Sequence, residues 1–284
     1  MIEISGKTRQ LAVIGNPISH SFSPQLHTYI ADKLGLDYVY TALRVREEEL
    51  DKAIEGIRAL NFAGINITSP YKFRVLDMMD GLSDKAKKYG SVNTCVNRDG
   101  KLYGYTTDAD GFYRSLLVEG IDIKGKDILF IGAGGATQPV VLLFAELGAK
   151  SISIVNRTVE KAQRLAEYTK KITGFDVEIG INKKHYDVVI NTTTVGMHPD
   201  TDKCPVSDMP YVDEKTAVAD MIYNPEKTMF LKMAEKKGAK IVNGLGMLIF
   251  QGIIAFELFT GAKVPDDMYY DIMRDVFKAE KEKA

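Results

Sequence analysis

One segment constrains the fold more than any other: an apolar strand-like stretch runs into closely spaced glycines and then into an apolar helix-like stretch. Within ILFIGAGGATQPVVLLFAELG, the glycines and the start of the helix are Gly132, Gly134, Gly135 and Ala136. Backbone N–H groups in such a turn can approach a pyrophosphate at a helix N-terminus, where the helix dipole favours negative charge. Thr137 stands where the common fingerprint has its third glycine. A plain strand-to-helix turn is the alternative, but the placement after a buried strand favours dinucleotide binding.

The end of the next predicted strand indicates which dinucleotide. About twenty residues after the glycines the chain reads Asn156-Arg157-Thr158, without the Asp or Glu that binds the ribose of NAD. Arg157 can pair with a 2′-phosphate and lie over the adenine, while Asn156 and Thr158 add neutral donors. Alternatively, Thr158 only caps its helix and Arg157 is a solvated charge. The pattern favours NADP over NAD.

The second half of the chain predicts a doubly wound α/β domain. Short apolar runs alternate with helical patterns, and strands are expected at residues 127–131, 151–155, 177–179, 187–191, 218–219 and 240–242. Strands that are apolar throughout, separated by helices, are typical of a parallel sheet covered on both faces.

The first half also alternates between strand and helix patterns. Strands are expected at 10–15, 38–45 and 64–68, with a hairpin of 92–97 and 101–106 around Asp99-Gly100. Ser23-Pro24 predicts a helix N-cap with a proline in the first turn. Leu50, Ile54, Ile57 and Leu60 predict a second helix. Beyond Gly246 the chain is expected to be helical, with a break at Val264-Pro265 and a closing amphipathic helix.

Composition limits the function classes. The 284 residues suit two modest domains, and the net charge of −1 disfavours a nucleic-acid binder. Cys95 and Cys204 make no disulfide framework, and with four histidines they offer no clustered zinc site. The N-terminus lacks a signal-peptide pattern, and the apolar stretch 244–259 is too short to span a bilayer. We therefore expect a cytoplasmic protein that acts on a small molecule without membrane or nucleic-acid partners.

A series of motifs along the chain carries a family resemblance. In order they are HSFSP (20–24), NITSPYK (66–72), SVNT (91–94), GYTTD (104–108), GAGGA (132–136), NRT (156–158), NTTTVGM (191–197), DMIYNP (220–225) and GLGMLIFQG (244–252). Together they resemble the shikimate and quinate/shikimate dehydrogenase family, from about residue 10 to residue 255. The resemblance implies an α/β substrate domain of residues 1–107, with 247–284 packing back on it, and a Rossmann-type NADP domain of residues 108–246.

The resemblance also implies roles for individual residues. Those expected to hold a substrate carboxylate, or to lie beside it, are Ser21, Ser23, Thr68 and Tyr223. Those expected to bind the hydroxyls of a carboxylated cyclic polyol are Asn66, Asn93 and Gln251. Those expected along the nicotinamide end of the cofactor are Thr192, Met221 and Gly244. The implied reaction interconverts 3-dehydroshikimate and shikimate in aromatic amino-acid biosynthesis.

Lys72 and Asp108 are expected to flank the hydroxyl that is oxidised. Oxidation of an alcohol needs a hydride acceptor and a proton acceptor. Burial would lower the pKa of Lys72 toward that second role, whereas the neighbouring carboxylate would raise it, and the sequence leaves the balance open. We predict Lys72 as the proton shuttle and Asp108 as its partner. Asp108 is also a natural N-cap for a helix over 109–119, and one carboxylate can do both.

Three departures from the family pattern stand out. Thr106 and Thr28 replace asparagines, and Gln138-Pro139 replaces small or basic residues after the glycine turn. Thr106 lies two residues from Asp108, so it bears either on the hydrogen bonding around the catalytic pair or on the preference for ring substituents.

Rival functions are a dehydrogenase for quinate or an aminated analogue of shikimate, and a catalytically silent protein that senses the metabolite. The intact Lys72 and Asp108 pair argues against the silent protein. Two YxxxK patterns, at 29–33 and 211–215, do not indicate a short-chain dehydrogenase, because the glycine turn of that class lies near the N-terminus. His20 and His27 receive no role, and the oligomeric state stays open.

Overall fold

A computed structural model describes residues 4–278 of the chain. The chain divides into two compact units: the first comprises residues 1–107 with 249–284, and the second comprises residues 108–248. Helix α8 (Leu245–Thr260) carries the chain from the second unit back into the first.

The first unit is built on a mixed six-stranded sheet with the order β2-β1-β3-β5-β6-β4. Its strands are β1 (Arg9–Gly15), β2 (Tyr38–Arg44), β3 (Gly64–Ile67), β4 (Gly81–Leu82), β5 (Thr94–Arg98) and β6 (Lys101–Tyr105). Strand β1 pairs in parallel with both β2 and β3, whereas β3 pairs antiparallel with β5. The β5–β6 hairpin turns at Asp99 and Gly100, which both have positive φ (53° and 82°), as a tight two-residue turn requires.

Helices of the first unit differ in detail from the sequence expectations. They are α1 (Ser23–Lys33), α2 (Leu50–Ala59), α3 (Asp84–Tyr89) and α9 (Met268–Ile272), with 3₁₀ turns at Glu47–Glu49 and Leu76–Met78. Ser23 is the first helical residue rather than the N-cap, because Phe22 holds that position without a side-chain cap. Leu60 lies beyond α2 and is 72% exposed. The closing helix is short, since α9 passes into a π-helical stretch at Met273–Lys278.

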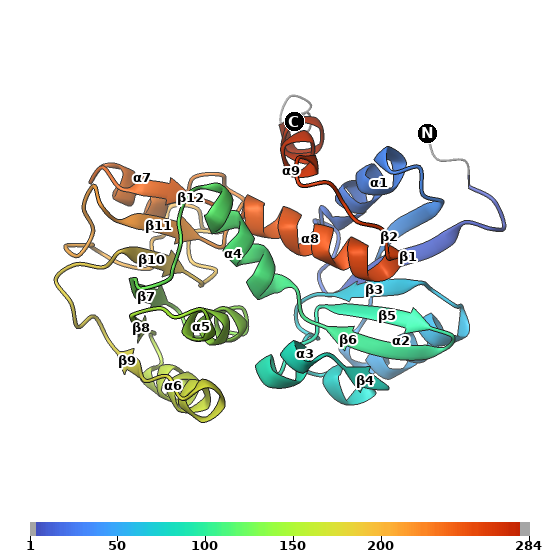
Figure 1. Ribbon diagram of the computed structural model, residues 1–284, viewed down its shortest axis with the longest axis horizontal. Coiled ribbons are helices and arrows are strands. Elements are labelled where there is room, and N and C mark those ends of the chain that lie inside the picture. Colours follow the sequence, from blue (N-terminus) through green and yellow to red (C-terminus); the bar gives the residue numbers. More distant parts are fainter. Residues whose placement is uncertain (1–3, 279–284) are drawn as a thin grey trace. The chain divides into compact units, whose positions relative to one another are not determined.

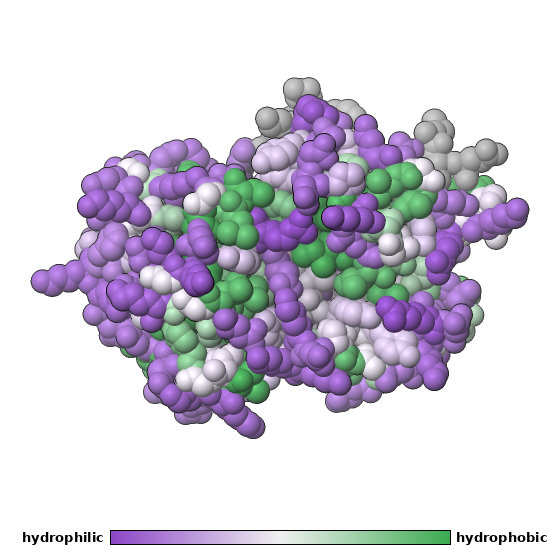
Figure 2. All heavy atoms as spheres, viewed as in Figure 1, coloured by the Kyte–Doolittle hydropathy of each residue, from purple (hydrophilic) through white to green (hydrophobic). Residues whose placement is uncertain are grey.

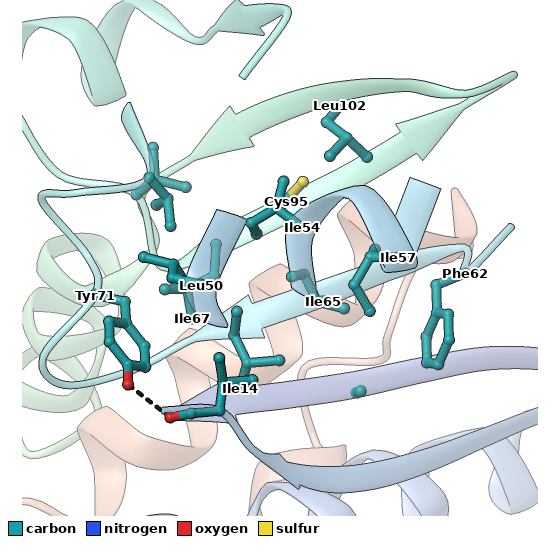
Figure 3. Close-up of a cluster of buried hydrophobic side chains, with 14 of the residues drawn as sticks. Ile14, Leu50, Ile54, Ile57, Phe62, Ile65, Ile67, Tyr71, Cys95 and Leu102 are labelled. Atoms are coloured by element: carbon teal, nitrogen blue, oxygen red, sulfur yellow. Dashed lines mark hydrogen bonds between the residues drawn. The ribbon is translucent and has the colours of Figure 1, made fainter. Parts of the chain in front are cut away.

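The core of the first unit lies between α2 and the sheet (Figure 3). Leu50 and Ile54 on α2 pack with Ile65 and Ile67 on β3, and all four are at most 1% exposed. Burying each such side chain contributes roughly 1.5–3 kcal/mol. The Tyr71 hydroxyl donates to the Val45 carbonyl at 2.6 Å, so the one polar atom that Tyr71 brings into the core is paired. This packing fixes the segment just before Lys72.

The second unit is an all-parallel six-stranded sheet with the order β12-β11-β10-β7-β8-β9. Its strands are β7 (Asp127–Ile131), β8 (Ser151–Val155), β9 (Val177–Ile179), β10 (Val188–Asn191), β11 (Ala217–Asp220) and β12 (Lys240–Val242). Numbered from β7, this is the 3-2-1-4-5-6 order of the dinucleotide-binding fold. The expected α/β class and doubly wound sheet are confirmed.

Helices of this unit cover both faces of its sheet (Figure 1). They are α4 (Asp108–Val118), α5 (Thr137–Glu146), α6 (Val159–Thr173) and α7 (Met229–Glu235). The order runs outward in opposite directions from β7 and β10, and right-handed crossovers then place α5 and α6 on one face and α7 on the other. The reversal between β7 and β10 is a topological switch point, where ligands of such sheets bind.

In the part of the chain that the structure describes, no helix is long and apolar enough to cross a bilayer. Figure 2 shows a face on which hydrophilic side chains predominate and hydrophobic ones lie in scattered groups. Both cysteines are free, and burial raises the pKa of the Cys95 thiol to about 12. Among residues 4–278, no cluster of histidine, cysteine or carboxylate side chains could hold a metal ion.

Candidate cofactor and substrate sites

The residues expected to bind the cofactor all follow the carboxyl ends of strands in the second unit. Gly132 follows β7, Asn156 follows β8, Thr192 follows β10, Met221 follows β11 and Gly244 lies two residues beyond β12. The carboxyl ends of parallel strands meet at one edge of a sheet, so these positions gather at the edge that contains the switch point. The structure therefore brings residues from five separate motifs to one edge.

The glycine turn is open where a phosphate would approach. Gly132 has a φ of 116°, and a Cβ there would lie 2.5 Å from Thr192 Oγ1, so both its conformation and its neighbours require glycine. At Gly134 a Cβ would meet nothing within 4 Å, and Gly135 and Ala136 are exposed beside it. Helix α5 begins directly afterwards at Thr137. The turn thus offers backbone at a helix N-terminus with open space before it.

Asn156 joins the ends of β7 and β8. Its Oδ1 accepts from the Ala133 N–H at 3.1 Å, and its Nδ2 donates to the Thr158 carbonyl at 2.7 Å. Arg157 is exposed and forms no hydrogen bond or ion pair with any residue in the described range 4–278. Thr158 occupies the N-cap position of α6, but its hydroxyl makes no cap hydrogen bond. Asn156 therefore shapes the turn, whereas Arg157 and Thr158 present exposed side chains beside it, and their binding of a 2′-phosphate stays a prediction.

A buried carboxylate organises the ends of β10 and β11. Asp220 is 0% exposed and accepts from Asn191 Nδ2 (3.0 Å), the Ile222 N–H (3.0 Å) and Thr228 Oγ1 (2.7 Å). Burial raises its pKa to about 6, and the three donors oppose that rise. Asp220 opens the motif DMIYNP, but its role could not be predicted, because an acidic residue at a strand end carries no sign of its burial.

Asn191 and Gly244 complete this edge. Asn191 Oδ1 accepts from the Thr193 N–H (3.0 Å) and from Thr193 Oγ1 (2.7 Å), which shapes the loop that contains Thr192. A Cβ at Gly244 would overlap the Met221 carbonyl, and the Gly244 N–H donates to the Ile222 carbonyl at 3.0 Å. The close approach explains the glycine and fixes the backbone of Met221.

In the first unit, a neutral amide network underlies the residues expected to bind substrate. Asn66 is 6% exposed, and its Nδ2 donates to the Asn93 carbonyl and to Thr94 Oγ1, each at 3.1 Å. Its Oδ1 accepts from the Tyr40 hydroxyl at 2.7 Å. The contacts that the structure gives to Asn66 are therefore with protein groups, which fix the strand ends that carry Asn93.

Asn93 and Gln251 lie together, although 158 positions separate them in the chain. Asn93 Nδ2 donates to Thr107 Oγ1 at 2.9 Å and reaches Gln251 Oε1 at 3.4 Å, and its Oδ1 accepts from the Thr107 N–H at 2.8 Å. Thr107 Oγ1 also donates to the Gln251 carbonyl at 3.1 Å. Thr107 is the residue here that sequence reasoning missed, and it directly precedes Asp108.

The expected catalytic pair lies at two well-anchored points of the backbone. Lys72 is half-buried, and its carbonyl accepts from the Val92 N–H at 2.9 Å. Asp108 is 7% exposed and is the first residue of α4, one position earlier than the predicted helix start. The side chain of each contacts the protein. Their roles in catalysis stay predictions.

Serine and threonine side chains of the expected carboxylate site lie near the start of α1 and the end of β3. Ser21 Oγ accepts from the Ser23 N–H at 3.3 Å, which leaves the Ser21 hydroxyl proton available to a ligand. Ser23 is buried, whereas Ser21 and Thr68 are partly exposed. Tyr223, in the second unit, is half-buried, and burial raises its pKa.

The two histidines without an assigned role differ in environment. His27 is 1% exposed and stacks on the Tyr40 ring with centroids 4.2 Å apart, and burial lowers its pKa to about 3. It is a packed, neutral side chain. His20 is exposed at the surface.

The departures from the family pattern lie in different environments. Thr28 is exposed on α1, and Pro139 is buried in the first turn of α5, where proline is tolerated. Thr106 is 6% exposed, and its hydroxyl has no hydrogen-bond partner among the described residues.

The strand order and the glycine edge together define a dinucleotide-binding α/β protein with a separate α/β unit. Three family models match the chain: the shikimate dehydrogenase substrate binding domain over residues 13–95, shikimate/quinate 5-dehydrogenase over 116–219, and the shikimate 5′-dehydrogenase C-terminal domain over 244–276.

Individual relatives match over nearly the whole chain. An NADP(+) shikimate dehydrogenase of Alkaliphilus metalliredigens is 41% identical over 272 residues, covering 93% of this chain and 95% of the relative. A crystal structure of a shikimate dehydrogenase in complex with NADP+ has a TM-score of 0.91 and 38% identity, covering 96% of this chain and 97% of that one. One from Listeria monocytogenes, in complex with shikimate and NAD, has a TM-score of 0.88 and 36% identity, with 95% and 98% covered. The chain belongs to the shikimate dehydrogenase family, which confirms the resemblance seen in its motifs.

Proposed function

We propose that this chain is an NADP-dependent oxidoreductase that interconverts 3-dehydroshikimate and shikimate, a step of aromatic amino-acid biosynthesis. One observation carries the proposal: five expected cofactor-binding motifs of this chain lie at the strand ends that gather at the switch point. The chain that contains them is 41% identical to an NADP(+) shikimate dehydrogenase. The second unit binds the cofactor and the first unit binds the substrate. We place the enzyme in the cytoplasm, where biosynthetic enzymes of this kind work.

The residues at the glycine edge fit NADP. The exposed turn at Gly134, Gly135 and Ala136 can receive the pyrophosphate, and Arg157, which has no partner among residues 4–278, can donate to a 2′-phosphate. Thr192, Met221 and Gly244 line the nicotinamide end in this proposal. When bound, NADP supplies the hydride acceptor or donor of the reaction.

The first unit supplies most of the polar groups that hold the substrate. Its Ser21, Ser23 and Thr68, with Tyr223 of the second unit, bind the carboxylate. Asn93 and Gln251 bind ring hydroxyls, and Asn66 acts beside them through the strand ends that it fixes. Thr107 holds the Asn93 side-chain amide and the Gln251 backbone carbonyl, so little freedom of the Asn93 side chain is lost when the substrate binds.

Lys72 and Asp108 handle the proton. Lys72 in its neutral form takes the hydroxyl proton as the hydride leaves the ring carbon, and Asp108 orients the lysine by accepting a hydrogen bond from its Nζ. In the reverse direction Lys72 returns the proton to the carbonyl oxygen.

A matrix of substrates and cofactors tests the proposal. The purified chain is assayed with shikimate and quinate, each with NADP and NAD, and the four kcat/KM values are compared. We expect the highest value for shikimate with NADP. A preference for quinate or an aminated analogue would keep the mechanism and change the substrate, whereas NADP binding without turnover of any pair would indicate a metabolite-binding protein.

A further inference from the structure

The position of the missing third glycine holds a side chain with a definite arrangement of hydrogen bonds. Thr137, the first residue of α5, is 0% exposed although it directly follows the exposed Ala136. A glycine at this place would leave the Gly134 N–H without the hydroxyl that accepts from it. The threonine hydroxyl lies instead between the glycine turn and the end of β10.

Four polar groups form one continuous chain through Thr137. The Gly134 N–H donates to Thr137 Oγ1 at 3.0 Å, Thr137 Oγ1 lies 2.7 Å from Thr192 Oγ1, and Thr192 Oγ1 donates to the Ile131 carbonyl at 3.0 Å. Each hydroxyl has a single proton. When the Thr192 hydroxyl donates to the Ile131 carbonyl, Thr137 donates to Thr192 and accepts from Gly134, so every hydroxyl in this series of hydrogen bonds is paired.

This series of hydrogen bonds connects the two strands that flank the switch point. Ile131 ends β7, Gly134 lies in the glycine turn, and Thr192 directly follows β10. Gly132 packs against the same hydroxyl, since a Cβ there would lie 2.5 Å from Thr192 Oγ1. The N–H of the exposed Gly134 is engaged by the Thr137 hydroxyl, which leaves the backbone N–H groups of Gly135 and Ala136 to face the phosphates.

We propose that Thr137 is a positioning residue for the nucleotide: its hydroxyl holds the glycine turn against Thr192, so that the pyrophosphate-binding turn and the loop at the nicotinamide end form one preorganised surface. This inference rests on the proposed placement of NADP at the glycine edge. Preorganised groups bind more tightly because less ordering is required on binding. Thr137 acts through Gly134 and Thr192 rather than by touching the reacting atoms.

Thr137→Val tests the proposal because it keeps the shape and removes the hydroxyl. We expect the Kd for NADPH, measured by titration calorimetry or by the nicotinamide fluorescence in a chain that has no tryptophan, to rise about tenfold, the effect of losing about 1.4 kcal/mol. The KM for shikimate should change less than twofold. Thr137→Ser, which keeps the hydroxyl, should bind NADPH within about threefold of wild type.

Thr169→Val is the matched control within the same unit. Thr169 is also 0% exposed, and its hydroxyl donates to the Leu165 carbonyl at 2.8 Å inside α6. Its loss should lower the Tm without changing the Kd for NADPH. If Thr137→Val binds NADPH as wild type does, or if Thr169→Val weakens binding equally, Thr137 has a structural role only and the proposal is overturned.

A double-mutant cycle with Thr192→Val keeps the test decisive should one variant fold poorly. If the Thr137 and Thr192 hydroxyls act through one series of hydrogen bonds, the double variant should bind NADPH no more weakly than Thr192→Val alone. Additive losses in NADPH affinity would show that the two hydroxyls act independently. NADPH binding by the wild-type protein distinguishes the proposed function from the proposed role of Thr137. No binding by wild type would overturn the proposed function, whereas tight binding that Thr137→Val leaves unchanged would overturn only the role of Thr137.

Discussion

Both units place buried polar side chains beneath their expected binding surfaces, but the two networks differ in charge. In the second unit the centre is a carboxylate, Asp220, which accepts three hydrogen bonds. In the first unit the centre is a pair of amides, Asn66 and Asn93, which both donate and accept. A carboxylate fixes its neighbours strongly but responds to pH, whereas an amide network is satisfied at every pH. The cofactor side should therefore respond to pH and the substrate scaffold should not.

The largest expected effect separates chemistry from cofactor binding. Lys72→Ala should lower kcat by about 10²–10⁴-fold, the usual range for loss of a general acid–base group. The Kd for NADPH should stay within about twofold, because the cofactor residues all belong to the second unit. Steady-state kinetics and calorimetry measure the two quantities. Lys87→Ala, at an exposed lysine on α3 of the same unit, is the control. Near-normal turnover in Lys72→Ala with weakened substrate binding would show that Lys72 only binds.

Asp220→Asn tests the claim that the charged network couples to pH. The folded pKa of Asp220, about 6, lies above its ordinary value of 3.8, so the folded state holds this proton more tightly than the unfolded state. Its contribution to stability is therefore full below about pH 4 and is lost as pH rises through about 6. One pKa unit corresponds to about 1.4 kcal/mol, so the loss is about 2–3 kcal/mol.

Urea denaturation between pH 4 and pH 7 measures how the free energy of unfolding depends on pH. Asp220→Asn should remove the part of this pH dependence that Asp220 contributes, whatever the variant's absolute stability. Asn93→Ser, in the amide network, should lower stability equally across the range. An unchanged slope in Asp220→Asn would mean that the three donors outweigh burial and hold this carboxyl near its ordinary pKa.

Arg157→Ala tests whether the second unit distinguishes NADP from NAD through the 2′-phosphate. An exposed arginine that pairs with a 2′-phosphate contributes one charge-assisted contact, so its loss should weaken NADP binding about 10- to 100-fold. NAD lacks that phosphate, so its Kd should not change. Arg164→Ala, two turns further along the exposed side of α6, is the matched control. Equal losses for both cofactors would mean that Arg157 contacts the adenine rather than the phosphate.

Apart from the two-residue β4, which was not predicted, the strands of both units were predicted from the sequence to within about two residues, because apolar runs bounded by glycine and polar turns have few alternatives. The sequence also located the glycine turn and the chain segments that follow the other strands. It missed groups whose importance depends on burial or on distant partners. Asp220 resembles any polar strand end, and Thr107 meets Gln251 across 144 positions. The wrong N-cap at Ser23 has a local cause, since Phe22 takes that position with helical dihedrals.

Thr106 gives the smallest expected effect and the sharpest test of the neutral network. Its hydroxyl is buried without a partner among the described residues, whereas the neighbouring Thr107 hydroxyl is paired on two sides. An unpaired buried hydroxyl is destabilising, so Thr106→Val should raise the free energy of unfolding by about 0.5–1 kcal/mol. Thr107→Val, which breaks existing hydrogen bonds, should lower it by about 1–2 kcal/mol.

Kinetics on the same pair of variants show whether the Thr106 hydroxyl has a partner in the substrate. If it does, Thr106→Val should raise the KM for shikimate by severalfold while the unliganded protein becomes more stable, and the Kd for NADPH should not move. Gain of stability with unchanged KM would mean that the hydroxyl contacts nothing in either state, so the departure at Thr106 would have no bearing on ring-substituent preference. Loss of stability would show that the hydroxyl is paired in the unliganded protein, and the contrast between Thr106 and Thr107 would then fail.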